Sequence, residues 1–239
     1  MESSLIGNKE TTIEFIDSES GATNNRLPFV IIPGLSESAE DYIPLMKLLS
    51  SRCIAISLRG RGKSDAPKMG YSLEDHISDI KSVIKHLKLD EFILMGFSRG
   101  VSYALGYAFT NLNSVKGIVL GDYPAHHTQL PPEWVDYFLA SPPWRGKSVS
   151  ERMKPHAIDG IQRDSKQVSF WDKLNLIQSP ILIIQGGKEG SALSVEDSVQ
   201  YLEKISKADL IVFEESNHNI FEPDLDKFVN VVEEFIENL

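Results

Sequence analysis

The chain has 239 residues, of which 24% are charged, and this length and composition are typical of one large globular α/β domain. Its formal net charge of −10 argues against nucleic acid or an anionic membrane surface as the main partner. Cys53 is the single cysteine, which excludes an intrachain disulfide, and no segment has the length and apolarity of a signal peptide or membrane span. We therefore expect a cytoplasmic protein with one domain over residues 1–239.

The first half of the chain predicts strands that alternate with helices. Residues 11–16 (TTIEFI) alternate between polar and apolar side chains and predict an antiparallel strand at the edge of a sheet. Short, unbroken apolar runs typical of buried strands and longer stretches with the apolar spacing of helices follow. The predicted strands are 29–32 and 53–58, and the predicted helices are 43–49 and 73–87.

The centre of the chain carries the sequence GFSRG at residues 96–100, between a predicted strand at 92–95 and a predicted helix. Strand, G-x-S-x-G and helix in this order form the context that the nucleophile-elbow motif requires. Because the turn is so tight, side chains at Gly96 or Gly100 would collide with the neighbouring strand or helix. Ser98 would then stand at the carboxyl end of the strand, above a helix N-terminus that favours negative charge. An ordinary buried strand followed by a helix of small residues is the alternative.

The pattern changes after the strand predicted at 115–120. Prolines and aromatic residues interrupt any sheet rhythm between residues 123 and 178, and we interpret this stretch as an inserted, small and mainly helical cap. The alternation then resumes with strands at 180–184 and 210–213 and helices at 194–205 and 223–239. Strands that alternate with helices predict an α/β fold with a mostly parallel, doubly wound sheet covered on both faces.

A serine hydroxyl needs a base, usually a histidine, to act as a nucleophile at neutral pH. His218 lies in a polar loop after the last predicted strand, at the same edge of the sheet as Ser98. We therefore predict His218 as the base. The alternative is that His218 is a surface-loop histidine without a catalytic role. The acid that orients this base would be Glu189 or Asp122, since each follows a predicted strand. We favour Glu189, because the turn before it carries glycines that could bring a side chain inward.

The carbonyl attacked by Ser98 would develop an oxyanion, which backbone N–H groups can stabilise. We predict one donor at Arg99, directly after the nucleophile, and a second at Leu35, which follows Pro33-Gly34 after a predicted strand. A plain turn is the alternative role of Pro33-Gly34. The sequence has no pattern of metal ligands, and we expect neither a metal ion nor a cofactor.

Together these motifs resemble the α/β-hydrolase superfamily, in its small-cap branch of esterases and lactonases, over essentially the whole chain. The resemblance rests on Pro33-Gly34, the turn LRGRGKSD at 58–65, the elbow at 96–100, the strand at 180–186 with its following acid, and Ser216-Asn217-His218. It implies a cofactor-independent serine hydrolase.

The chain departs from the family pattern at three positions. Glu189 stands where the family more commonly has aspartate, and Pro33 replaces a histidine before Gly34. Arg99 follows the nucleophile, where smaller or apolar residues are more usual. We expect the Arg99 side chain to form an ion pair with an acidic neighbour, and a bias of the site toward anionic substrates is the alternative.

The sequence thus predicts an enzyme that hydrolyses a small ester-type substrate (a carboxylic ester, lactone or thioester) through Ser98, an acid and His218. A carbon–carbon bond hydrolase or lyase with the same triad and a weakly hydrolytic ligand sensor are the alternatives. Aromatic residues of the cap suggest an apolar pocket for a small molecule, with core packing between cap and sheet as the alternative. Neither the natural substrate nor the oligomeric state follows from the sequence.

Overall fold

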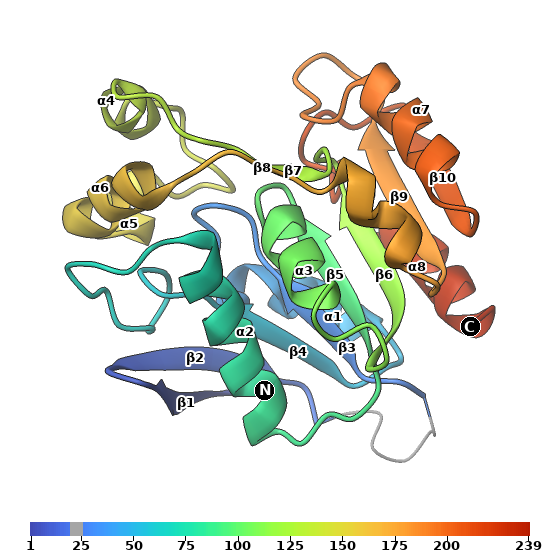
Figure 1. The fold of residues 1–239 in the computed structure, drawn as a ribbon, viewed down its shortest axis with the longest axis horizontal. Coiled ribbons are helices and arrows are strands. Elements are labelled where there is room, and N and C mark those ends of the chain that lie inside the picture. The colour runs from blue at the N-terminus through green and yellow to red at the C-terminus, as the bar shows by residue number, and fades with distance from the viewer. Residues whose placement is uncertain (20–25) are drawn as a thin grey trace.

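The computed structural model describes residues 1–19 and 26–239, and helices cover both faces of its central sheet (Figure 1). Eight strands of the described chain form this sheet in the order β1-β2-β4-β3-β5-β6-β9-β10. All neighbours from β4 to β10 run parallel, whereas β1 and β2 are antiparallel to their neighbours. The strands are β1 (Glu2–Asn8), β2 (Thr11–Asp17), β3 (Phe29–Ile32), β4 (Cys53–Ser57), β5 (Phe92–Phe97), β6 (Val115–Gly121), β9 (Ile181–Gly186) and β10 (Ala208–Phe213). This architecture confirms the predicted α/β class.

Each face of the sheet has its own apolar core. Alternate residues of a strand point to opposite faces, so Val30 and Ile32 of β3 pack in one core and Phe29 and Ile31 in the other. Helices α2 (Leu73–His86), α3 (Gly100–Ala108) and α7 (Val195–Lys204) contribute to the first core. The 3₁₀ turn η1 (Ala39–Tyr42) and helices α1 (Ile43–Leu48) and α8 (Leu225–Glu237) contribute to the second.

The sheet extends one strand beyond the predicted edge. Residues 11–16 lie in β2, which pairs with β1 on one side and β4 on the other, so the prediction of an edge strand there is wrong. The sequence of β1, ESSLIGN, gives little hydrophobic signal because Leu5 and Ile6 are its only large apolar residues. Of these two, only Ile6 is buried, and backbone pairing along the whole of β2 defines the strand.

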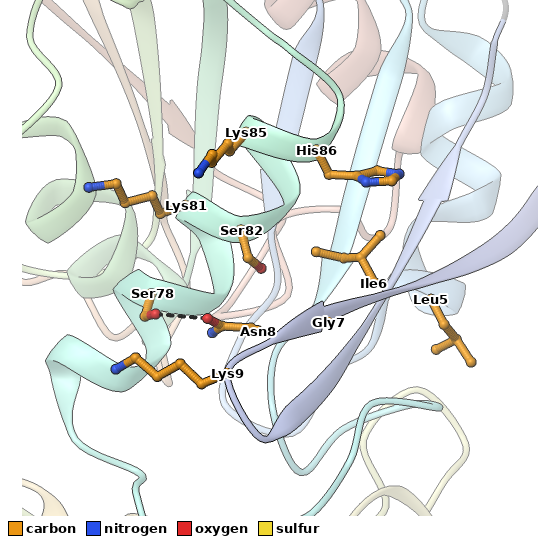
Figure 2. Close-up of a pocket in the computed structure, with 10 residues that line it drawn as sticks. All are labelled: Leu5, Ile6, Gly7, Asn8, Lys9, Ser78, Lys81, Ser82, Lys85 and His86. Carbon is orange, nitrogen blue, oxygen red and sulfur yellow. Dashed lines mark hydrogen bonds between the residues drawn. The ribbon is translucent and has the colours of Figure 1, made fainter.

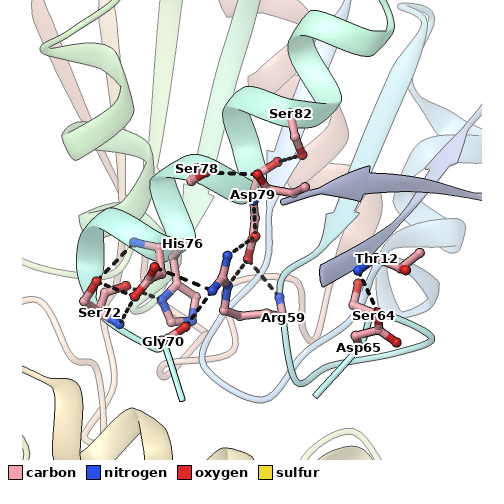
Figure 3. Close-up of polar contacts among 12 residues, drawn as sticks. Thr12, Arg59, Ser64, Asp65, Gly70, Ser72, His76, Ser78, Asp79 and Ser82 are labelled. Atoms are coloured by element: carbon pink, nitrogen blue, oxygen red, sulfur yellow. Dashed lines mark hydrogen bonds and ion pairs between the residues drawn. The ribbon is translucent and has the colours of Figure 1, made fainter. Parts of the chain in front are cut away.

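The turn after β4 is tied to helix α2 by a buried ion pair (Figure 3). Asp79 accepts hydrogen bonds from Arg59 Nε at 2.9 Å and Nη2 at 2.7 Å, the two-pronged geometry that suits guanidinium and carboxylate. Arg59 also donates to the carbonyl of Gly70, and Asp65 accepts from the Thr12 amide at 2.7 Å. These contacts hold the LRGRGKSD turn rigidly between the sheet and α2.

The chain between β6 and β9 carries three short helices that lie beyond the carboxyl ends of the strands (Figure 1), and its last turn, at 171–176, packs against α7. It contains β7 (His126–His127), α4 (Trp134–Leu139), α5 (Val149–Arg152), α6 (Pro155–Asp164), β8 (Val168–Ser169) and the 3₁₀ turn η2 (Trp171–Leu176). The boundaries of a cap at residues 123 and 178 stay a prediction. Within the described ranges, no helix combines the length and apolarity needed to cross a membrane.

Candidate active site

Ser98 occupies a strained turn between β5 and α3. Its φ is +52°, in the left-handed region that non-glycine residues rarely adopt, and its amide donates to the carbonyl of Gly121 at 2.8 Å. A Cβ at Gly96 would lie 2.7 Å from the carbonyl oxygen of Gly100, and one at Gly100 would overlap the carbonyl oxygen of Ile32. Only glycine fits at both positions, as the elbow geometry requires.

A continuous path of hydrogen bonds joins three side chains from distant parts of the chain. His218 Nε2 lies 2.8 Å from Ser98 Oγ, and His218 Nδ1 lies 2.7 Å from Asp122 Oδ2. In a neutral imidazole protonated at Nδ1, that N–H donates to the carboxylate, and Nε2 accepts from the serine hydroxyl. The imidazole is 24% exposed, whereas Asp122 is fully buried. The structure thus brings the predicted nucleophile and base within hydrogen-bonding distance.

The acid in this path is Asp122, at the end of β6, and its carboxylate is saturated with donors. Oδ1 accepts from the Gly186 amide at 2.9 Å and from the Ser191 hydroxyl at 2.6 Å. Oδ2 accepts from the Ala192 amide at 2.8 Å as well as from His218. These four donors hold the carboxylate in one orientation beside the imidazole.

The preference for Glu189 over Asp122 is therefore corrected by the structure. Glu189 lies in the loop after β9 with an exposed side chain, and no hydrogen bond joins it to His218 in the described structure. The glycines of that turn bring backbone toward the site instead of a carboxylate, because Gly186 donates its amide to Asp122. Ser191, which no motif of the sequence singles out, supplies the hydroxyl contact.

The two predicted oxyanion donors flank Ser98. A Cβ built at Gly34 would lie 3.3 Å from the Cβ of Ser98, so the loop after β3 packs directly against the nucleophile. The amides of Leu35 and Arg99 donate no hydrogen bond to any other described residue. Free N–H groups beside a nucleophile are what an oxyanion hole requires, although their role in this chain stays a prediction.

Glu37, a residue that sequence reasoning missed, links the loop after β3 to the segment above it. Its buried carboxylate accepts from the Gly34 amide at 3.0 Å and from the Tyr42 hydroxyl at 2.6 Å. The other oxygen accepts from Trp144 Nε1 at 2.8 Å and lies 3.2 Å from Arg145 Nε. A single glutamate between polar neighbours has no distinctive sequence signal, so its role emerges only from the fold.

A cavity of about 340 Å³, here called the Ser98 pocket, opens above Ser98 and His218. Most of its walls are apolar or small, and Lys147 and Arg152 are its basic residues. The lining residues are Gly34, Leu35, Ser36, Glu37, Phe97, Ser98, Phe138, Ser141, Pro142, Pro143, Trp144, Lys147, Val149, Arg152 and His218. Phe138 and Trp144 thus line the pocket, whereas Phe170 packs in the core, so the aromatic residues of this segment divide between the two predicted roles.

The family model described as "alpha/beta hydrolase fold" matches residues 28–156, which include the elbow and both loops beside it. The chain belongs to the alpha/beta hydrolase fold family. This result confirms the resemblance inferred from the motifs.

Curated relatives of this α/β hydrolase have several activities. It is 25% identical over 218 residues to AB hydrolase superfamily protein YisY of Bacillus subtilis, a match that covers 77% of this chain and 81% of that protein. It is 34% identical over 92 residues to 2-(acetamidomethylene)succinate hydrolase of Mesorhizobium japonicum. That second match covers 38% of this chain and spans a third of the relative's length (33%).

Solved structures match the hydrolase over its full length. An esterase from Exiguobacterium antarcticum superposes with a TM-score of 0.83 at 24% identity, covering 99% of this chain and 100% of that one. The esterase RhEst1 from a Rhodococcus species gives a TM-score of 0.80 at 22% identity, with both chains fully covered (100%). At these identities the likeness shows the fold.

The side chain of Arg99 forms no ion pair with any described carboxylate, so the expected ion pair is corrected. Its guanidinium donates instead to the Tyr103 hydroxyl, to His127 Nε2 and to the carbonyl of Thr128, at 3.0 to 3.2 Å. Burial, with the nearby Arg99 charge, lowers the pKa of His127 to about 3. His127 is therefore neutral at physiological pH.

A larger hollow of about 700 Å³ in the hydrolase lies away from this site, between β1 and α2 (Figure 2). Strands β2, β4 and β3 separate it from β5, which Ser98 follows. Its lining includes Lys9, Lys81, Lys85 and His86 but none of the residues that meet at Ser98. This hollow therefore has no part in the site described above.

Proposed function

We propose that this α/β hydrolase is a serine hydrolase that cleaves a small carboxylic ester, lactone or thioester through an acyl-enzyme. The observation that carries the proposal is the path of hydrogen bonds from Asp122 through His218 to Ser98 below a largely apolar pocket. The buried acid, the partly exposed base and the hydroxyl at the pocket floor have the order that nucleophilic catalysis requires.

In the proposed reaction, His218 Nε2 takes the proton of Ser98 as Oγ attacks the carbonyl carbon of the substrate. The carbonyl oxygen becomes an oxyanion and accepts hydrogen bonds from the amides of Leu35 and Arg99. The imidazolium, stabilised by Asp122, then returns the proton to the departing alcohol or thiol. Water deprotonated by His218 attacks the acyl-enzyme and releases the acid and free Ser98.

The Ser98 pocket favours a short, apolar acyl or alcohol group. Its volume of about 340 Å³ lies at the lower end of the range for small-molecule sites. Phe97, Phe138 and Trp144 supply aromatic walls, so apolar contact would provide most of the binding. The expected substrates are therefore esters with short chains.

A carbon–carbon bond hydrolase or lyase with the same three residues is the second candidate. One observation favours keeping it: a putative 2-succinyl-6-hydroxy-2,4-cyclohexadiene-1-carboxylate synthase of Bacillus subtilis is 34% identical over 94 residues. That match covers 38% of this chain and 34% of the relative, and the relative's name describes a synthase. A matching sequence in this family can therefore serve chemistry other than ester hydrolysis.

The experiment that tests the proposed function is a screen of the purified protein with p-nitrophenyl esters of increasing chain length, lactones, thioesters and a diketone. We expect turnover of the short-chain esters and a loss of at least about 10³-fold in kcat for Ser98→Ala. Ser82→Ala, at a serine on α2 away from the site, is the matched control. Near wild-type activity of Ser98→Ala would refute the chosen nucleophile, whereas turnover of a diketone alone would favour the second candidate.

A further inference from the structure

Two arginines are buried beside the predicted oxyanion hole without an acidic partner. Arg61, in the turn after β4, is 2% exposed, and Arg99, after the nucleophile, is 3% exposed. Within the described ranges, no carboxylate oxygen pairs with either guanidinium, whereas the buried arginines 59 and 152 pair with Asp79 and Asp41. Uncompensated buried charges are rare because removing a charge from water is costly.

The partners of Arg61 are neutral, and one of them is Leu35, in the loop after β3. Nε donates to the carbonyl oxygen of Leu35 at 2.8 Å, and Nη1 donates to the carbonyl oxygen of Arg59 at 2.7 Å. Nη1 also lies 2.8 Å from His76 Nε2. Nη2 is buried and has no hydrogen-bond partner in the described structure. Arg61 thus fixes Leu35 while much of its charge stays unanswered.

The groups around Arg99 do not neutralise its charge either. Its three partners are a tyrosine hydroxyl, a carbonyl oxygen and the imidazole of His127. The imidazole of His76 stacks on Tyr103 at 4.5 Å between ring centres, and burial followed by the Arg61 charge holds its pKa well below the usual value. Both imidazoles are therefore uncharged at neutral pH. Burial lowers the pKa of Arg61, but a guanidinium is so basic that it stays protonated in folded proteins. The cluster carries two net positive charges.

Both arginines are connected to the predicted oxyanion donors. Arg99 supplies one of the two predicted donor amides from its own backbone, and Arg61 holds the residue that supplies the other. Neither side chain lines the Ser98 pocket, so substrate does not contact them directly. In a site screened from water, a fixed charge acts over several ångströms, and a negative charge that appears only in the transition state gains most from it.

We propose that Arg61 and Arg99 are positioning residues that supply a positive field to the oxyanion formed at Ser98. This inference rests on the proposed function. The oxyanion then supplies the negative charge that the two arginines lack in the folded protein. The two arginines stabilise the oxyanion through the donor amides of Leu35 and Arg99 and by direct electrostatic attraction.

The test compares charge-removing with charge-keeping variants. The variants Arg99→Gln and Arg61→Gln remove one positive charge each, and Arg99→Lys and Arg61→Lys retain it. His127→Gln and Tyr103→Phe are matched controls, because they disturb the hydrogen bonds of Arg99 but leave both charges in place. Melting temperature is measured for all six variants, so that loss of folding is recognised.

Two readouts report on the oxyanion. The first is kcat/KM for p-nitrophenyl acetate. The second is the inhibition constant of phenylboronic acid, whose neutral boron accepts a lone pair of Ser98 Oγ while the serine proton passes to His218. The adduct is a tetrahedral boronate anion, so its affinity measures anion stabilisation without turnover. A merely structural role of the arginines would not link these two quantities.

We expect each glutamine variant to lose roughly 10- to 100-fold in kcat/KM and to weaken boronate binding by a similar factor. The lysine variants should recover most of both, and the two controls should stay within about 3-fold of wild type. Unchanged boronate binding in folded glutamine variants would overturn the proposal. Equal losses in the controls and the lysine variants would overturn it too, because geometry and not charge would then be responsible.

Failure of the proposed function gives a different result. If Ser98→Ala bound the boronic acid as tightly as wild type, or if wild type hydrolysed no ester, the serine hydrolase assignment would fall. If wild type hydrolysed the ester through Ser98 and the glutamine variants matched it in both readouts, only the role of the arginine pair would fall.

Discussion

At the residue scale, the backbone and the contacts of Asp122 fix its carboxylate against His218, which its position in the sequence alone does not predict. Its φ of +46° and its four donors hold the carboxylate at one orientation against His218. Left-handed backbone in a non-glycine residue is strained, and such strain concentrates at functional sites. Ser98 and Asp122, the two strained residues of the site, directly follow the neighbouring strands β5 and β6.

Replacement of each candidate acid by its amide tests the assignment of Asp122 as the acid. Asp122→Asn keeps the shape of the side chain but no longer stabilises an imidazolium, and we expect kcat to fall by about 10²- to 10⁴-fold. Glu189→Gln, at an exposed position, should stay within about 2-fold of wild type. Steady-state kinetics with a p-nitrophenyl ester measures both. A larger loss for Glu189→Gln than for Asp122→Asn would restore the original preference.

Cys53 provides a second test at a single residue. Burial raises the pKa of its thiol to about 12, so almost no thiolate exists at pH 8. We expect no reaction of native protein with iodoacetamide over the time in which the urea-unfolded protein is fully alkylated, as followed by intact mass. Rapid alkylation of the native protein would show that the β4 core opens far more readily than its packing indicates.

His127 makes the stability of the folded protein depend on pH. Its pKa is about 3 in the folded protein against an ordinary value near 6.5, so the unfolded chain binds the additional proton between these limits. The stability from the neutral imidazole is present above pH 6.5 and is lost as the pH falls toward 3. We expect the urea midpoint to fall from pH 7 to pH 5 and to fall less in His127→Gln. An identical fall of the urea midpoint in wild type and His127→Gln would show that His127 does not cause the pH dependence.

At the scale of elements, the turn after β4 depends on the buried pair of Arg59 and Asp79. Removal of one partner leaves the other charge buried, so Asp79→Asn should lower the free energy of unfolding by about 3 to 5 kcal/mol. Glu91→Gln, which breaks the exposed pair with Lys116, is the control and should cost less than about 1 kcal/mol. Urea unfolding measures both. Similar losses for the two variants would show that burial does not govern the strength of these pairs.

The sequence identified elements best where the motif itself requires one geometry. The elbow needs glycine at 96 and 100 because any Cβ there would meet backbone, and this constraint is visible in the sequence. β1 escaped prediction because its stability comes from backbone pairing with β2 and not from a hydrophobic pattern. A tertiary hydrogen bond leaves no such local trace.

The same reasoning explains which site residues could be predicted. His218 could be predicted because parallel strands bring their carboxyl ends to one edge of the sheet, whatever the intervening sequence. The choice between Glu189 and Asp122 depended on which loop turns inward, and the contacts of Ser191 and Ala192 that decide it arise only after folding. The neutral partners of Arg99 were likewise unpredictable, because they come from α3 and β7 and from Thr128 beyond β7.

At the scale of the whole molecule, the sheet brings Ser98 after β5, Asp122 after β6 and the loop after β10 to one edge. Residues 138–152 of the segment between β6 and β9 line the pocket above that edge. Glu37 ties the two layers together through the amide of Gly34 and the indole of Trp144. These contacts join the segment between β6 and β9 to the loop after β3.

The most direct test of this account is mass spectrometry of the protein after reaction with a fluorophosphonate, which labels an activated serine. We predict one adduct, on the peptide that contains Ser98, and its loss in His218→Ala, where the hydroxyl no longer has a base. An adduct on another serine, or undiminished labelling of Ser98 in His218→Ala, would contradict the account.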